Sequence, residues 1–196
     1  MSPVTRSVIA IPAGYASQEV ASFVAQLDDQ LRRQKEHTRT LTPADLEWQP
    51  APGMNTIGML MAHQAITEVG WTGLWIEDLQ RNEIRFQEIL GIDDSGMPLA
   101  PNSAPPAALA GKDLAFFDDL LDRARKHLKG VAASVRDSDL TMIRSRIRPN
   151  GEPIEVEVRW IIYHMLEHFA GHFGQILLLQ HARRALGVGD AAGRSV

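Results

Sequence analysis

Three histidines stand at successive four-residue steps in the last part of the chain: His164, His168 and His172. In an α-helix each such step turns the side chain by about 40° and advances it by about 6 Å, so all three project from one broad face. Imidazole nitrogens bind zinc and similar ions at about 2.1 Å. Because His164 and His172 are about 12 Å apart along the axis, one ion can bind two neighbouring histidines of this helix but not all three.

A third ligand must therefore come from another part of the chain. His63 is the candidate, because it lies halfway along a second helical pattern, on the stripe expected to face inward. His37 falls near a helix end and His127 has lysines close by, so these two are expected on the surface, and His181 lies off the histidine face and is not expected to be a ligand. One inward histidine is usually a hydrogen-bonded core residue, but this cluster favours a metal site.

Two pairings in the last helix satisfy the geometry. Residues 164–168 read H-x-x-E-H, the inverted zinc-protease pattern in which both histidines bind zinc and the glutamate acts as general base. The alternative pair is His168 and His172, which has Gly171 and Gly174 beside it. Small residues there leave room for an exogenous ligand at an open coordination position, so we prefer this second pair.

The histidine face is expected to coincide with the apolar face of its helix. Continuing the same stripe on both sides gives Ile161, Gln175, Leu179, Ala182 and Leu186. The histidines would then interrupt a seam that faces the core, where buried imidazoles need partners.

Apolar periodicity indicates the elements that must position these side chains. Four long helices are expected, at about 17–40, 55–79, 113–136 and 155–186. Residues 91–111 contain four prolines and no period, which indicates a long crossover. Alternating residues at 143–147 and 154–158 around Asn150-Gly151 predict a hairpin, in which arginines of one arm could pair with glutamates of the other. The fold class is therefore all-α: a four-helix bundle with a long crossover after its second helix and a small β-hairpin before its fourth.

Composition excludes several classes of function. The 196 residues carry a net charge of -4, the wrong sign for binding nucleic acid through its phosphates. There is no cysteine, so any thiol chemistry must use an external thiol. The most apolar stretch, 160–179, contains a glutamate and three histidines, which makes membrane insertion expensive. We expect a cytoplasmic protein with no membrane partner.

Two motifs resemble those of a known family. The run WIIYHMLEHFAGHFGQI at 160–176 is similar to the last-helix signature of the DinB-like superfamily, which includes bacillithiol and mycothiol transferases. The runs LTP at 41–43 and WQPAPG at 48–53, leading into IGMLMAH at 57–63, resemble the region around the start of its second helix. The resemblance covers about residues 17–186. It implies one DinB-like domain over 1–196, with the core bundle at about 17–186 and a tail at each end.

The resemblance also implies a site. Its metal ligands fall on His63, His168 and His172, with zinc or nickel as the usual ion, and homodimers are common in the family. His164 would then lie behind the ligands or face the substrate, and Glu167 would lie on the surface or orient a neighbour. The mycothiol-dependent isomerase branch tends to have glutamate where this chain has His168, which argues against that specific reaction.

The leading hypothesis is a metal-dependent enzyme that acts on a small molecule, most simply a thiol-dependent S-transferase. Three neutral imidazoles leave the ion its full charge and an open position for a thiol or a water. Tyr163 and Gln175 join His164 as candidates around the metal or the substrate, and Trp71 and Trp75 are candidates for the pocket wall. A metal-dependent hydrolase and a non-catalytic stress protein that binds a metal or ligand are the alternatives.

Overall fold

The computed structural model describes residues 6–148 and 150–187. Its α-helices and strands, in chain order, are α1 (Gln18–Thr38), α2 (Pro43–Glu47), α3 (Ile57–Trp71), α4 (Phe86–Leu90), α5 (Leu114–Ala132), β1 (Ile143–Ile147), β2 (Pro153–Glu157) and α6 (Val158–Ala185). Short 3-10 turns occur at Arg81–Glu83 and Ala107–Leu109. Within these two ranges no helix is both long and apolar enough to cross a membrane.

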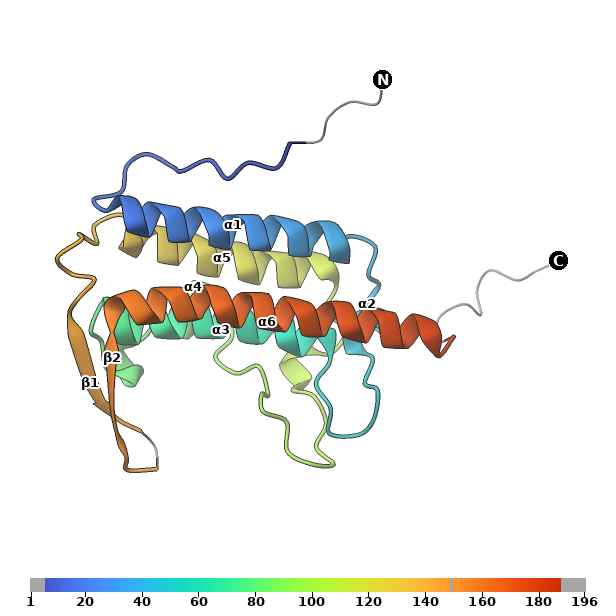
Figure 1. The fold of residues 1–196 in the computed structure, drawn as a ribbon. Helices are drawn as coiled ribbons and strands as arrows, with labels where there is room; N and C mark the ends of the chain where they lie inside the picture. Colours follow the sequence, from blue (N-terminus) through green and yellow to red (C-terminus); the bar gives the residue numbers. More distant parts are fainter. Residues whose placement is uncertain (1–5, 149, 188–196) are drawn as a thin grey trace, which may run out of the picture.

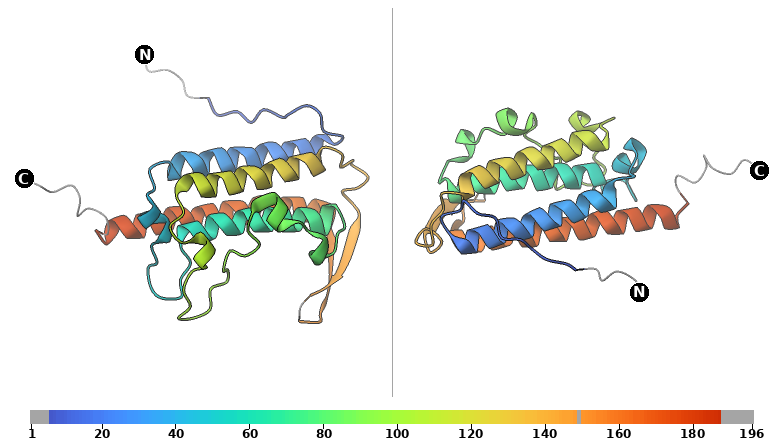
Figure 2. Two further views of the ribbon diagram at one scale, coloured as in Figure 1. Left: turned by 180° about the vertical axis from the view of Figure 1, so that it is seen from behind. Right: turned by 90° about the horizontal axis from the view of Figure 1, so that it is seen from above.

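Long helices dominate the architecture, with one small antiparallel sheet at one end (Figure 1). Helix α1 packs against α5 and α6, and α3 packs against the same two helices from the other side (Figure 2). Helix α3 is buried over most of its circumference, including Met59, Met61, Ala62 and Ala65. The expected all-α class is confirmed, and α3 and α6, the helices with the candidate ligands, lie side by side.

Helix starts follow the capping residues in the sequence. Ser17 Oγ accepts a hydrogen bond from the Val20 amide at 3.2 Å, and Thr56 Oγ1 accepts one from the Met59 amide at 3.1 Å. These side chains satisfy amides that have no carbonyl partner in the first turn of a helix. Thr42 caps the start of α2, and Pro43 is its first helical residue.

The end of α3 differs from expectation. A single helix to about Leu79 is wrong: α3 ends at Trp71 and passes into a π-helical segment, Thr72–Ile76. The Glu77 amide donates to Thr72 O across five residues, and Thr72 Oγ1 donates to Glu68 O. The π-helical segment is only five residues long, so its wider turn does not interrupt the apolar period enough to be seen in the sequence.

The hairpin forms, and Arg148 pairs with Glu152 beside its turn, but Arg144 and Arg146 do not pair with the glutamates of β2. In the observed register Arg144 lies opposite Val156 and Arg146 opposite Ile154, so these arginines and the glutamates of β2 occupy opposite faces. Both arginines instead pair with Asp78, which follows the π-helical segment. The hairpin is thus attached to the end of the α3 region, and Val158 belongs to α6 rather than to a strand.

Candidate metal centre

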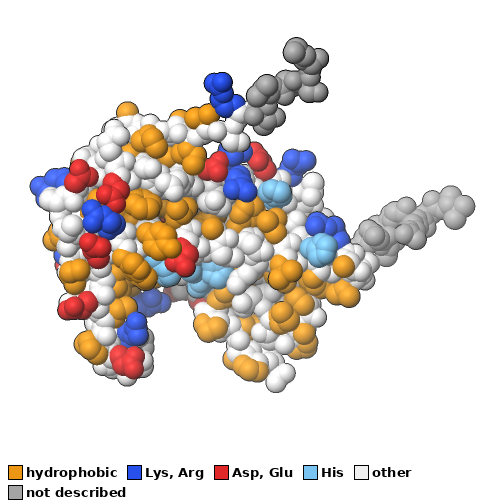
Figure 3. Space-filling view, viewed as in Figure 1, with side chains coloured by type: hydrophobic (Ala, Val, Ile, Leu, Met, Phe, Trp, Pro, Cys, Tyr) orange, Lys and Arg blue, Asp and Glu red, His pale blue; other side chains and the backbone are white. Residues whose placement is uncertain are grey.

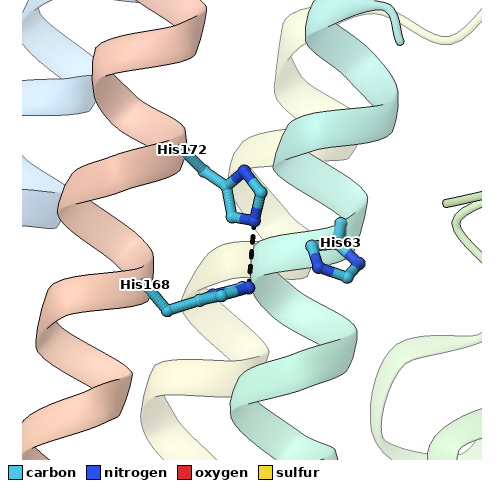
Figure 4. A group of neighbouring side chains, drawn as sticks. All are labelled: His63, His168 and His172. Atoms are coloured by element: carbon cyan, nitrogen blue, oxygen red, sulfur yellow. Dashed lines mark hydrogen bonds between the residues drawn. The ribbon is translucent and has the colours of Figure 1, made fainter. Parts of the chain in front are cut away.

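Three histidines from two helices meet between α3 and α6. His63 comes from α3, and His168 and His172 come from adjacent turns of α6 (Figure 4). Their ligand nitrogens all lie within 4.8 Å of one another, and the two Nε2 atoms of His168 and His172 are 2.9 Å apart. The His63 ring lies 5.1 Å from the His168 ring and 4.9 Å from the His172 ring, between centroids. The structure therefore brings together the preferred pair and the expected third histidine.

The dimensions and the chemistry of this group fit a divalent ion. Two metal–nitrogen bonds of about 2.1 Å limit the separation of two ligand nitrogens to about 4.2 Å. The His168–His172 pair lies within this limit at 2.9 Å, and the largest spacing in the group, up to 4.8 Å, needs only a small side-chain rotation to meet it. Burial, together with a smaller contribution from the neighbouring imidazoles, lowers the pKa of His63 to about 4 and that of His168 to about 3. Both side chains are therefore neutral at physiological pH, the form that binds metals.

In both His172 and His63 one ring nitrogen, Nδ1, faces a polar side chain outside the three-histidine group. His172 Nδ1 lies 2.8 Å from Gln175 Oε1, so the imidazole donates to the amide oxygen and keeps its Nε2 lone pair for a metal. His63 Nδ1 lies 3.4 Å from Ser95 Oγ. Gln175 thus lies behind a candidate ligand, as one of the alternatives from sequence suggested.

Ser95 was not identified from the sequence. It is buried in the connection after α4, where Asp94 Oδ1 accepts the Gly96 amide at 2.7 Å and forms a tight turn. Gly96 has φ 71°, and a Cβ at this position would lie 2.5 Å from Pro106, so only glycine fits. No spacing marks a serine in such an aperiodic segment, and only the folded path of the connection reveals its role.

The core-facing seam of α6 differs from the stripe expected at strict four-residue steps. The residues that α6 buries are Val158, Ile161, Ile162, Met165, Phe169, Phe173, Ile176 and Gln180. Gln175 and Leu186 are exposed, so that part of the expectation is wrong. Four-residue steps drift around a helix of 3.6 residues per turn, whereas the core follows mixed three- and four-residue steps. The histidines consequently lie half-buried at the edge of the core, beside solvent.

His164 occupies an aromatic stack next to the metal ligands. Its ring lies 4.6 Å from Trp160 and 4.7 Å from Trp71, and its Nδ1 is 3.2 Å from Glu167 Oε2. The His164 and His168 rings are 6.1 Å apart, against 4.2 Å for His168 and His172. His164 is outside the three-histidine group, an arrangement that favours the second pairing over the inverted-protease one.

The other aromatic candidates lie in three places: beside the centre, in the core and on the surface. Trp71 lies 4.6 Å from the His168 ring and forms a wall of the centre. Trp75 is 8% exposed and packs in the core, with the Arg146 guanidinium 5.7 Å from its ring. Tyr163 is 48% exposed and lies five residues before His168, about 140° around the helix.

The surface is hollowed below the centre. Histidine side chains, in pale blue, appear at the top of a notch between two projections (Figure 3). In the same view one projection is the β1–β2 hairpin, and the other is the pair of long loops beside α2 and after α4 (Figure 1). Gly171 and Gly174 face open space, since a Cβ at either would meet no atom within 4 Å. The centre is therefore open to small molecules on one side.

Comparison with known proteins identifies the family. The model of the DinB superfamily matches residues 26–176. The crystal structure of a conserved protein from Enterococcus faecalis is similar in fold, with a TM-score of 0.60 and 16% sequence identity over 84% of this chain and 95% of that one. No functionally curated protein gives a significant match. Since the family model covers well over half of its length, this chain belongs to the DinB superfamily.

Proposed function

We propose that this protein is a DinB-like four-helix-bundle metalloenzyme, in which His63, His168 and His172 hold a divalent ion, zinc or nickel. The observation that carries the proposal is the convergence of three imidazoles, with ligand nitrogens within 4.8 Å and the outer nitrogens of two rings turned to Ser95 and Gln175. A histidine whose outer nitrogen is engaged in this way has a fixed ring orientation and tautomer.

We assign a thiol-dependent transfer to this site. A divalent ion on three neutral imidazoles supplies Lewis acidity and lowers the pKa of a bound thiol or water. The chain has no cysteine, so the thiol is an external small molecule. Its sulfur gives an electron pair to an electrophilic carbon of the substrate, and the leaving group of that carbon departs with the bonding pair.

His164 is the side chain that we assign to the thiol proton. It lies beside the ligand group, and Glu167 faces its Nδ1 at 3.2 Å. A carboxylate at one ring nitrogen leaves the other as the proton acceptor. Trp71 and Trp160 both contact the ring, with centroids 4.7 Å and 4.6 Å away, which fixes its orientation.

We also propose that the protein is a homodimer. Three large side chains on α6 are well exposed: Trp160 at 46%, Tyr163 at 48% and Leu178 at 65%. Apolar side chains gathered along one helix are typical of a surface that a second copy covers. Sedimentation at micromolar concentration tests this, and a monomer throughout the range would refute it.

The function is tested in two steps. Metal analysis of protein purified without a nickel column identifies the ion, and a panel of small thiols and electrophiles is then screened with and without added metal. Conjugation that needs metal and thiol together supports the proposal. Hydrolysis without any thiol would favour the hydrolase, and a metal-loaded protein that turns over nothing would favour the binding protein.

A further inference from the structure

A polar cavity lies at the end of the α3–α6 pair that is remote from the hairpin, where α2 lies beside the C-terminal part of α6 (Figure 1). Its volume is about 160 Å³. The polar side chains that line it are Thr40, Asp45, Gln180, Arg183 and Arg184. Every residue of this set except Asp45 is a hydrogen-bond donor or carries a positive charge.

Gln180 is the first sign that the cavity has an occupant. Its side chain is 8% exposed, and the Nε2 atom is buried with no acceptor among the residues that the structure describes. Buried amide donors nearly always have an acceptor, because leaving one unpaired destabilises the fold. Among residues 6–148 and 150–187, the acceptor that this amide calls for is therefore missing.

The charges around the cavity do not balance. Arg183 Nη1 lies 2.5 Å from Asp45 Oδ1. The other oxygen of Asp45 accepts from the Thr42 amide at 2.7 Å and from the Thr42 hydroxyl, so this carboxylate is fully engaged. Arg184 has no ion pair within residues 6–148 and 150–187, which leaves an excess of positive charge at the cavity.

We propose that this cavity binds a small oxyanion, the phosphate or carboxylate group of a metabolite. Such a group has only acceptors, and it would pair with the Gln180 amide, the Arg184 guanidinium and the Thr40 hydroxyl. At about 30 Å³ for each water, the cavity has the space of roughly five waters. That space fits a single anionic group with a few further atoms.

The anion site is separate from the metal centre. Gln180 follows His172 by eight residues, about 12 Å along α6. A bound anion would join the end of α6 to the α1–α2 connection, and its effect would appear as stabilisation of the fold.

Thermal unfolding and calorimetry with the full chain test the proposal, using inorganic phosphate, acetate and chloride at constant ionic strength. The melting temperature is expected to rise with the logarithm of phosphate or acetate concentration. The anion that raises it more shows whether the site prefers a phosphate or a carboxylate group. The effect is expected both in chelator-treated and in metal-loaded protein, which separates it from anions on the metal.

Two variants and a charge-matched control decide the location. Arg184→Glu and Gln180→Glu are expected to raise the anion concentration needed for half-saturation at least tenfold. Arg33→Glu, on the exposed face of α1, is expected to leave this concentration unchanged. The side-chain amide resonances of Gln180 are expected to shift on titration with the same anion. Equal stabilisation of Arg184→Glu and Arg33→Glu, or an unshifted Gln180 amide at saturation, would overturn the proposal.

Discussion

The side-chain amide of Gln64 donates a hydrogen bond to the backbone carbonyl of Phe169, 3.1 Å away and 105 residues later in the chain. Each of these residues directly follows a candidate ligand, His63 in one helix and His168 in the other. Gln64 also exchanges two hydrogen bonds of 2.9 Å with Gln34 of α1. This buried group fixes the register of α3 against α6, and with it the spacing of the histidines.

Gln64→Leu should therefore disturb both stability and metal binding. The substitution leaves the Gln34 side-chain amide unpaired in the core and removes the additional hydrogen bond to the Phe169 carbonyl, a loss of about 1–3 kcal/mol. Metal affinity should fall about tenfold, because the two ligand-bearing helices lose a shared constraint. Urea unfolding and metal titration measure the two effects, and Gln87→Leu, on the exposed face of α4, is the control. Normal metal affinity in a clearly destabilised Gln64→Leu protein would contradict this role.

His168→Ala should reduce bound metal to about a tenth of the wild-type content or less, because the central ligand is lost. His164→Ala should retain most of it, since His164 lies outside the three-histidine group. Metal content by mass spectrometry on protein purified without a nickel column provides the measurement, with His181→Ala as the exposed control on α6. If His164→Ala empties the site and His172→Ala does not, the inverted-protease pairing is correct.

The metal-free protein should lose stability as the pH falls from about 6.5 toward 4. Folding lowers the pKa of His63 to about 4 and of His168 to about 3, whereas both titrate near 6.5 in the unfolded chain. In this window the unfolded chain binds more protons than the folded one, so the free energy of unfolding decreases with falling pH, and above the window these groups add no slope. Chelator-treated protein unfolded by urea at several pH values shows the slope. The free energy of unfolding should depend less steeply on pH in the His63→Ala, His168→Ala double variant.

Trp71 should report metal binding through its fluorescence. Its ring lies 4.6 Å from the His168 ring, whereas Trp75 is packed in the core against Arg146. Addition of nickel should quench the emission of the wild type and of Trp75→Phe to a similar extent. The quenching should be largely lost in Trp71→Phe, with metal content measured in parallel to show that the ion is still bound.

Asp78→Asn should loosen the hairpin. Asp78 pairs with both Arg144 and Arg146, and the hydrogen bond from Arg146 holds the pKa of this carboxyl below its ordinary value. Because Asp78 has φ 63°, asparagine keeps the backbone conformation while it removes the charge. We expect a loss of about 1 kcal/mol and faster hydrogen exchange in β1 and β2. Unchanged exchange in the strands would show that other contacts hold the hairpin in place.

The sequence predicted those features that depend on neighbours along the chain. The starts of α1 and α3, expected near residues 17 and 55, follow from apolar periodicity, and the approach of His168 to His172 follows from helical pitch. The third histidine, His63, was placed by the inward stripe of its helix. These features need only local geometry and a period.

Features that depend on packing were not predictable in this way. The π-helical segment is five residues long, too short for its wider turn to appear in an apolar period, and the arginines of β1 find their partner in Asp78 only because the hairpin register turns them toward it. Ser95 reaches His63 through the path of an aperiodic connection. In each case a side chain or backbone group from a distant part of the chain determines the outcome.

The separation of the two halves of the centre has a consequence for biosynthesis. A chain emerges from the ribosome from its N-terminus at about 5–20 residues per second, so α3 is made well before the helix that covers it. Helix α3 is apolar around most of its surface, and the acceptor for Gln64 and two of the three histidines arrive only with α6. Nascent α3 therefore cannot pack against α6 until α6 has been synthesised, and until then α1, α5 or a chaperone must cover its apolar surface. The metal centre is consequently among the last parts of the molecule to assemble.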